Sequence, residues 1–356
     1  MNAELPYTRK AANPANIRNM QWAAIAALAL VPICLITYLP RINRLGLYLD
    51  DWRNLADLSD NGHIDYLTAR PLNLRVLEWG WSIFGTNIQA YLWVAVVLLF
   101  VSAWMYWLLL YVVLPNGYRA LALPIAVLFL VYPSNYSRVW WTLWPMSLLV
   151  VIVLGGILAY VAFVRRGHVG WLLAALGLLG FSLFWYELQL GLIAALPLLG
   201  LAQLRRSSWV RRLLIVSPTL LAGLFAVWWV LAPSSNKEYQ TSTLTFAPVE
   251  LAKRFIGSYY TILAVTWIEP IRFLRAQALP RWEAVAIFVV MAVAVVLVGL
   301  WLVRSWPDAK AAAVARQAID WKPLLFAIAI ALLTIGLGVL TGMLRIDIRI
   351  GIFDSR

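Results

Sequence analysis

Long apolar runs constrain the fold of this chain more than any other feature of its sequence. Residues 92–113 and 285–303 contain no charged side chain. A helix needs about 20 apolar residues to cross a bilayer, whereas a strand of a membrane barrel needs only about 10 with alternating polarity. The chain is 63% hydrophobic and 13% charged, and soluble domains carry about 25% charged residues. The sequence therefore predicts an all-α polytopic membrane protein.

Nine segments are predicted to cross the membrane, at residues 21–39, 89–114, 120–132, 145–164, 169–186, 188–204, 213–231, 284–303 and 323–341. A further apolar run at 255–268 is short for a span and more typical of a re-entrant segment. If this run crosses the membrane, the chain has ten spans, and every later segment lies on the opposite side of the membrane. No internal repeat or linker divides the sequence, so residues 1–356 are expected to form a single membrane-embedded domain. Because nine spans leave the C-terminus outside, we expect the natural protein to continue beyond it.

The basic residues predict the orientation. With the N-terminus inside, the inner segments carry 14 Lys and Arg against 3 acids, and the outer segments carry 15 against 13. Short connections rich in Lys and Arg face the cytoplasm. We therefore expect a multi-pass protein of the cytoplasmic (inner) membrane with its active face outside. The formal charge of +13 then reflects orientation and contact with anionic membrane lipids, and no nucleic-acid partner is predicted.

Two adjacent acids stand out in the first outer loop, residues 40–88, where the active site is expected. Asp50 and Asp51 are followed by Trp52. Neighbouring carboxylates repel each other, which can raise the pKa of one of them toward that of a useful general base. In the alternative interpretation the loop is solvated, and Asp51 is the N-cap of a helix from 52 to 58.

An arginine before a predicted helix is the second candidate. Arg70 precedes Pro71, which favours the first turn of a helix, and that helix is predicted to run to residue 84. Helix N-termini attract anions, and a guanidinium there suits a phosphate or a carboxylate. The alternative is a salt bridge from Arg70 to Asp50 or Asp51. The two interpretations are compatible if Arg70 pairs with an acid in the free protein and with the anion when a ligand is bound.

Two further outer segments contribute candidates. The loop at 133–144 combines aromatic residues with Arg138, which can hold a sugar or a lipid phosphate; the alternative is an aromatic belt with a snorkelling arginine. Glu187 lies between two apolar runs, where an acid is costly unless it faces a cavity or a partner such as an outer arginine. We expect Glu187 to join Asp50 and Asp51 in catalysis. The substrate and its phosphate are expected to contact Arg70, Arg138, Trp52, Tyr136 and Trp140.

Other kinds of site lack a sequence signal. One Cys and two His are too few for a disulfide within the chain or a His-rich metal centre. The sequence has no phosphate-binding loop and no dinucleotide fingerprint, so no metal ligands are predicted and the cofactor is unknown. A divalent metal stays open, because an Asp-Asp pair alone does not decide it.

The order of these features resembles the GT-C superfamily of integral-membrane glycosyltransferases. It looks closest to the bacterial polytopic enzymes of the glucosyltransferase kind that modify surface polysaccharide. The resemblance implies a hexosyltransferase that uses a polyprenyl-phosphate sugar donor and acts on the outer face. The acceptor would be an envelope glycan or a lipid-linked molecule. In that superfamily an acid of the first outer loop is the catalytic base, a position that Asp50 matches here, with Asp51 as the second choice.

Two other functions compete with this interpretation. A lipid-linked sugar transporter or flippase would place ionisable groups at mid-membrane in broken helices. The predicted spans at 89–114, 145–164 and 284–303 contain no charged residue, which disfavours transport. A non-catalytic partner of envelope polysaccharide assembly is the other alternative, and it should tolerate Asn at position 50.

Overall fold

The computed structural model describes residues 14–42, 49–61, 71–114, 119, 121–131, 144–186, 189–206 and 208–231, with single positions at 249, 253, 256, 257 and 260. Every regular element in these residues is helical, and none of them lies in a strand. The all-α prediction is thus confirmed for this part of the chain. In chain order the elements are α1 (Pro14–Ile42), α2 (Leu49–Asn61), α3 (Pro71–Phe84), α4 (Ile88–Val113), α5 (Ala122–Leu130), α6 (Trp144–Arg166), α7 (Val169–Trp185), α8 (Leu190–Ala195), η6 (Leu196–Gly200), α9 (Leu201–Arg206) and α10 (Trp209–Leu231).

Four of the described helices are long and apolar enough to cross a membrane. Their apolar segments are Gln21–Leu39 within α1, Ile88–Val113, Trp144–Arg166 and Trp209–Trp229. Two shorter apolar segments, Val169–Trp185 and Leu190–Gly200, lie between the last two of these in the sequence. By the length and composition of its helices, the chain is a membrane protein.

The predicted spans match the helices closely in five places, where α1, α4, α6, α7 and α10 occupy the expected segments. The predicted span at 120–132 corresponds to the short α5. The segments 284–303 and 323–341, and most of the run 255–268, lie outside the described residues. The counts of nine and ten spans therefore stay predictions.

The predicted span at 188–204 is a broken segment rather than one helix. It consists of α8, the 3-10 helix η6 and α9, and Pro197 lies near the start of η6. Proline has no N–H to donate, and its ring clashes with the carbonyl one turn earlier. The chain tightens into a 3-10 turn at this point. Hydropathy detects the apolar run but not this break.

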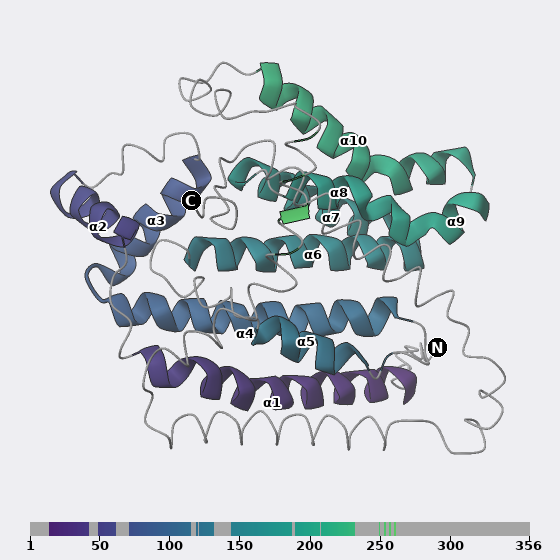
Figure 1. The fold of residues 1–356 in the computed structure, drawn as a ribbon. Coiled ribbons are helices and arrows are strands. Elements are labelled where there is room, and N and C mark those ends of the chain that lie inside the picture. The colour runs from purple at the N-terminus through teal and green to yellow at the C-terminus, as the bar shows by residue number, and fades with distance from the viewer. Residues whose placement is uncertain are drawn as a thin grey trace, which may run out of the picture.

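The long helices lie side by side, with α4 packed between α1 and α6 (Figure 1). α6 also packs on α7, and α10 packs on α7 and α8. A glycine permits the close approach of α6 and α7, because a Cβ atom at Gly156 would lie 2.7 Å from Cγ of Leu179. Small residues serve this purpose where membrane helices pack closely.

Hydrogen bonds between helices add direction to this packing. The Tyr38 hydroxyl on α1 donates to the carbonyl of Leu130 on α5 at 2.7 Å. The Tyr160 hydroxyl on α6 donates to the carbonyl of Ile215 on α10 at 2.8 Å. Such bonds contribute about 0.6 kcal/mol each inside a membrane. They fix the rotation of neighbouring helices as much as they stabilise them.

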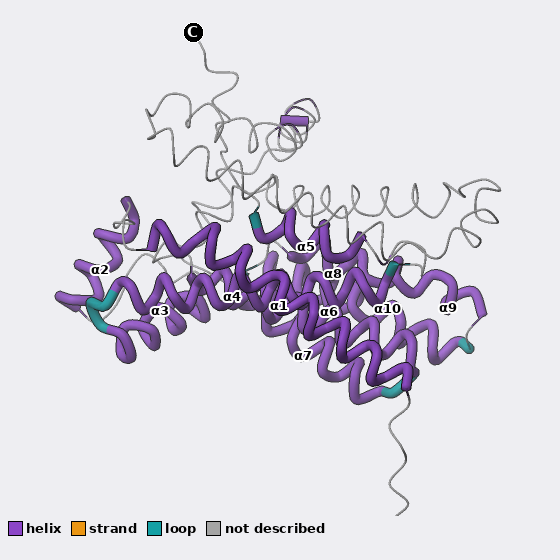
Figure 2. Tube along the Cα trace, turned by 90° about the horizontal axis from the view of Figure 1, so that it is seen from below, coloured by secondary structure: helices purple, strands orange, loops and turns teal. Residues whose placement is uncertain are grey.

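The bundle has two distinct ends. At one end, both views show α2 and α3 together beside the start of α4 (Figures 1 and 2); we name it the α2–α3 end. The opposite end collects the C-terminal ends of α4 and α6 and the start of α10. We name it the arginine end, after Arg119, Arg165, Arg166, Arg211 and Arg212.

Candidate functional site

The acidic pair lies in the first turn of α2. This helix begins at Leu49 and ends at Asn61, so Asp50 and Asp51 are its second and third residues. The alternative in which Asp51 caps a helix from 52 to 58 is therefore wrong, because the helix begins before Asp51. The first turn of a helix is where negative charge is favoured by the helix macrodipole. The position thus suits two acids whether or not they react.

One side of α2 is buried and the other is exposed. Asn54 and Leu58 are buried, whereas Asp60 is exposed. The helical period of 3.6 residues places positions 50 and 51 on the side of Asn54 and Leu58. Position 52, occupied by Trp52, falls near the opposite side. The side chains of these three residues are not among those that the structure describes, so their contacts stay a prediction.

α3 begins at Pro71 and ends at Phe84, as the sequence predicts. Its Leu74 and Leu77 side chains are buried in the core cluster that also contains Leu58 of α2. Its other side exposes both charged and large apolar side chains. It carries an ion pair between Arg75 and Glu78, with 3.0 Å between Nη1 and Oε2. α3 therefore has one side in the core and the other exposed.

A buried hydrogen bond joins α3 to the end of α7. The indole Nε1 of Trp185 donates to Oδ1 of Asn73 at 3.3 Å, and both side chains are buried. The two residues are 112 positions apart. This bond couples the helical connection between α1 and α4 to the core of the bundle.

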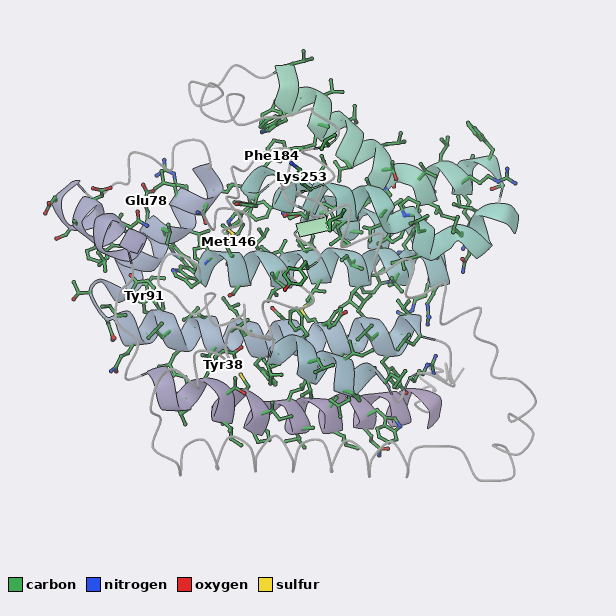
Figure 3. The ribbon with its side chains drawn as sticks, in the orientation of Figure 1. Tyr38, Glu78, Tyr91, Met146, Phe184 and Lys253 are labelled. Atoms are coloured by element: carbon green, nitrogen blue, oxygen red, sulfur yellow. The ribbon has the colours of Figure 1, made fainter. Side chains whose placement is uncertain are left out.

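α3 also contacts the starts of α4 and α6. A Cβ atom at Gly80 would lie 2.7 Å from Cζ2 of Trp144 and 3.1 Å from Cε1 of Tyr91. The rings of Phe84 and Tyr91 meet edge to face, with centroids 5.2 Å apart. Glu78 and Tyr91 are seen at this end in Figure 3. These contacts position α3 over the N-terminal ends of both long helices.

Two buried polar atoms of α6 have no hydrogen-bond partner among the residues that the structure describes. They are Nε1 of Trp144 and Oγ of Ser147. An unpaired buried polar group costs about 1–3 kcal/mol, so such groups are often explained by a bound water or ligand. The sequence analysis includes position 144 in the aromatic loop at 133–144 without assigning it a role of its own, and it misses Ser147, because a lone Ser carries no signal.

Five predicted site residues lie in segments that the structure does not describe: Arg70, Tyr136, Arg138, Trp140 and Glu187. The flanking residues show where these segments attach. Trp144 follows the loop at 132–143 and contacts α3 at Gly80. Tyr186 precedes position 187 and closes α7, its backbone N–H donating to the Ser182 carbonyl at 3.0 Å. The structure thus brings the attachment points of these segments together at the α2–α3 end.

No metal centre is found among the described side chains, where no group of three or more His, Cys, Asp and Glu lies together. Comparison with known proteins adds no family: no family model, no curated protein and no solved structure matches this chain.

Proposed function

We propose that the chain is a membrane glycosyltransferase of the hexosyltransferase type. It moves a sugar from a polyprenyl-phosphate donor to an envelope glycan or a lipid-linked acceptor, on the outer face of the cytoplasmic membrane. The observation that carries this proposal is the placement of Asp50 and Asp51 in the first turn of α2, at helical positions on the side of the buried Asn54 and Leu58. Acids at positions on the buried side of a helix are costly unless they serve a site or a partner.

The arrangement of the α2–α3 end supports the same proposal. Two short helices connect α1 to α4, and α3 is fixed to α7 through Asn73 and Trp185. The loops that carry Arg138 and Glu187 attach to α6 and α7 at this end. A general base needs rigid support close to the groups that bind its substrate, and an anchored α3 beside these attachment points suits that need.

In the proposed reaction Asp50 removes the proton from an acceptor hydroxyl, with Asp51 as the second choice for this role. The acceptor oxygen forms a bond to the anomeric carbon of the sugar. The bond between that carbon and the phosphate oxygen breaks, and the polyprenyl phosphate leaves with the electron pair. Arg70 and Arg138 stabilise the negative charge on the leaving phosphate. Trp52, Tyr136 and Trp140 supply aromatic faces for the sugar or the lipid, and Glu187 is the third acid of the site.

A flippase for lipid-linked sugars is the second candidate, favoured by one observation. The broken segment α8–η6–α9 resembles the interrupted helices of transporters. However, residues 190–204 contain no ionisable side chain, and transporters use such groups at their breaks. The same absence holds for α4, which contains no charged residue over its length.

The test replaces each acid in the full-length gene and measures envelope glycans by mass spectrometry. A strain that lacks the gene is complemented with the wild type, Asp50→Asn, Asp51→Asn or Asp60→Asn. Asp60 is the matched control because it is an exposed acid of the same helix. We expect a sugar-sized mass to vanish on deletion and to return with the wild type and Asp60→Asn, but not with Asp50→Asn. Immunoblots of membranes confirm equal protein levels.

If both Asp50→Asn and Asp51→Asn restore the glycan fully, the acids are structural, and a scaffold or flippase takes the place of the enzyme. If the deletion leaves every glycan unchanged, the glycosyltransferase proposal is wrong.

A further inference from the structure

The arginine end presents several cations and no described acid. The acids with described side chains are Asp57, Asp60 and Glu78, and they all lie on α2 and α3 at the opposite end. Like charges gathered without acids repel one another, and they need counter-charges from backbone carbonyls, from solvent ions or from a ligand.

Two of these arginines meet at the C-terminal end of α4. The guanidinium carbon of Arg119 lies 5.1 Å from the ring centroid of Tyr111. Arg165 of α6 donates from Nη2 to the carbonyl oxygen of Val112, the residue that follows Tyr111 in α4. The two guanidinium groups therefore lie against consecutive residues of one helix, and their charges repel each other. The helix end supplies only about half of one negative charge, so a positive surplus stays in place.

Arg119 is held from one side by an aromatic ring. Its guanidinium carbon lies over the Tyr111 ring, and its buried Nε has no hydrogen-bond partner among the residues that the structure describes. Four of the five guanidinium N–H donors are on Nη1 and Nη2, and such a pair of groups suits the oxygens of a phosphate. The neighbouring ring of Trp107 stacks on Tyr111 with centroids 5.2 Å apart, which holds the Tyr111 ring in place against the guanidinium.

A further arginine lies at the adjoining helix end. Gly167 ends α6 with φ at +73°, a conformation that favours glycine, and its N–H donates to the Phe163 carbonyl at 2.7 Å. Arg211 of α10 donates to the Val164 carbonyl at 3.3 Å. The side chain of Arg166 is exposed beside it. The surplus of positive charge thus extends from the end of α4 to the end of α6.

Exposed tryptophans at the same end favour a lipid as the source of the phosphate. Trp209 at the start of α10 is 71% exposed, and Trp171 in the first turn of α7 is 42% exposed. Exposed aromatic residues beside arginines are typical of the level of the lipid headgroups. A soluble anion gains nothing from contact with these exposed apolar rings, whereas the glycerol and acyl portions of a phospholipid can pack against them.

We propose that the arginine end binds the phosphate group of an anionic phospholipid, with Arg119 and Arg165 as the pair that holds it. The phosphate lies at the C-terminal end of α4 and accepts hydrogen bonds from the edges of both guanidinium groups. The acyl chains extend along the apolar helix faces toward the membrane interior. This inference rests on described side chains at the arginine end alone and is independent of the proposed glycosyltransferase activity.

The test is native mass spectrometry of the purified full chain titrated with phosphatidylglycerol or with zwitterionic phosphatidylcholine. We expect phosphatidylglycerol to bind the wild type more tightly, and Arg119→Gln to weaken that binding about fivefold. Arg119→Lys should weaken it as well, because a lysine keeps the charge but lacks the planar edge. Arg75→Gln is the matched control, since Arg75 is an exposed arginine of the other end that pairs with Glu78. It should bind as the wild type does.

Three results would overturn the proposal. In the first, Arg119→Gln binds phosphatidylglycerol as well as the wild type. In the second, Arg119→Lys binds as the wild type, which reduces the site to diffuse charge attraction. In the third, inorganic phosphate is retained without lipid and displaces phosphatidylglycerol, which assigns the site to a free anion. Thermal unfolding in detergent confirms that the variants are folded. If Arg119→Gln does not fold, the comparison of Arg119→Lys with the wild type decides.

Discussion

At the scale of single residues, buried polar side chains of the bundle differ in whether they have a hydrogen-bond partner among the described residues. The indole of Trp185 donates to the buried amide oxygen of Asn73, whereas Oγ of Ser147 is buried and has no partner in the described part of the chain. Removing one member of a buried pair leaves the other unsatisfied, while removing an unpaired group leaves nothing behind. The two positions therefore respond to substitution in opposite ways.

Trp185→Phe removes the donor and strands Oδ1 of Asn73. We expect it to lower the free energy of unfolding by about 1–3 kcal/mol, measured by denaturation of the purified chain in detergent. Loss of the larger ring adds to the effect, so Trp185→Phe is also measured in an Asn73→Leu background. A smaller cost in that background assigns the difference to the hydrogen bond, and an equal cost in both assigns it to packing.

Ser147→Ala removes a hydroxyl for which the described residues supply no partner. We expect unfolding to occur at the same denaturant concentration as in the wild type, or slightly higher. A destabilisation above about 1 kcal/mol would show that a water or another group pairs with Ser147 inside the folded protein. If stability is kept while the envelope glycan is lost, Ser147 contacts the substrate.

At the scale of elements, the sequence predicts helices well where the signal is local. Pro71 marks the start of α3, and the predicted end at residue 84 is confirmed. α2 begins before the predicted cap, because Leu49 and the two acids also favour a first turn. Predicting the 3-10 turn at Pro197 requires comparing α-helical with 3-10 geometry, and hydropathy carries no information on that choice. The bond between Asn73 and Trp185 has no local signal, since it joins helices far apart in the chain.

The packing of α6 on α7 offers a test at this scale with neighbouring residues as test and control. A Cβ atom at Gly156 would lie 2.7 Å from Cγ of Leu179, whereas one at Gly155 would lie 3.5 Å from the nearest atom, an ordinary contact. We expect Gly156→Ala to destabilise the protein by about 1–3 kcal/mol through overpacking. Gly155→Ala should be neutral or slightly stabilising. Equal thermal unfolding of the two variants would contradict this account of the interface.

At the scale of the whole molecule, the side chains that the structure describes differ in charge between the two ends of the bundle. The acids among them lie on α2 and α3, and the arginines among them, apart from Arg75, lie where α4 and α6 end and α10 begins. Short basic connections face the cytoplasm. We therefore expect the proposed glycosyltransferase site and the proposed lipid site to lie at opposite surfaces of the membrane, with the arginine end facing the cytoplasm.

The single cysteine makes this orientation accessible to labelling. Cys34 is buried at 3% exposure on α1, so it should react slowly with a membrane-impermeant maleimide. In a Cys34→Ala background, Asp60→Cys places a thiol on the exposed side of α2, and Arg166→Cys places one at the arginine end. We expect the position-60 thiol to be labelled in intact spheroplasts and the position-166 thiol only after permeabilisation. The reverse pattern would invert the protein in the membrane, and labelling of both thiols from outside would remove at least one crossing between them. If the protein is inverted, the acidic pair lies on the inner surface, where it cannot meet a donor presented on the outer face. If both thiols are labelled from outside, the chain follows a different path between α2 and α6.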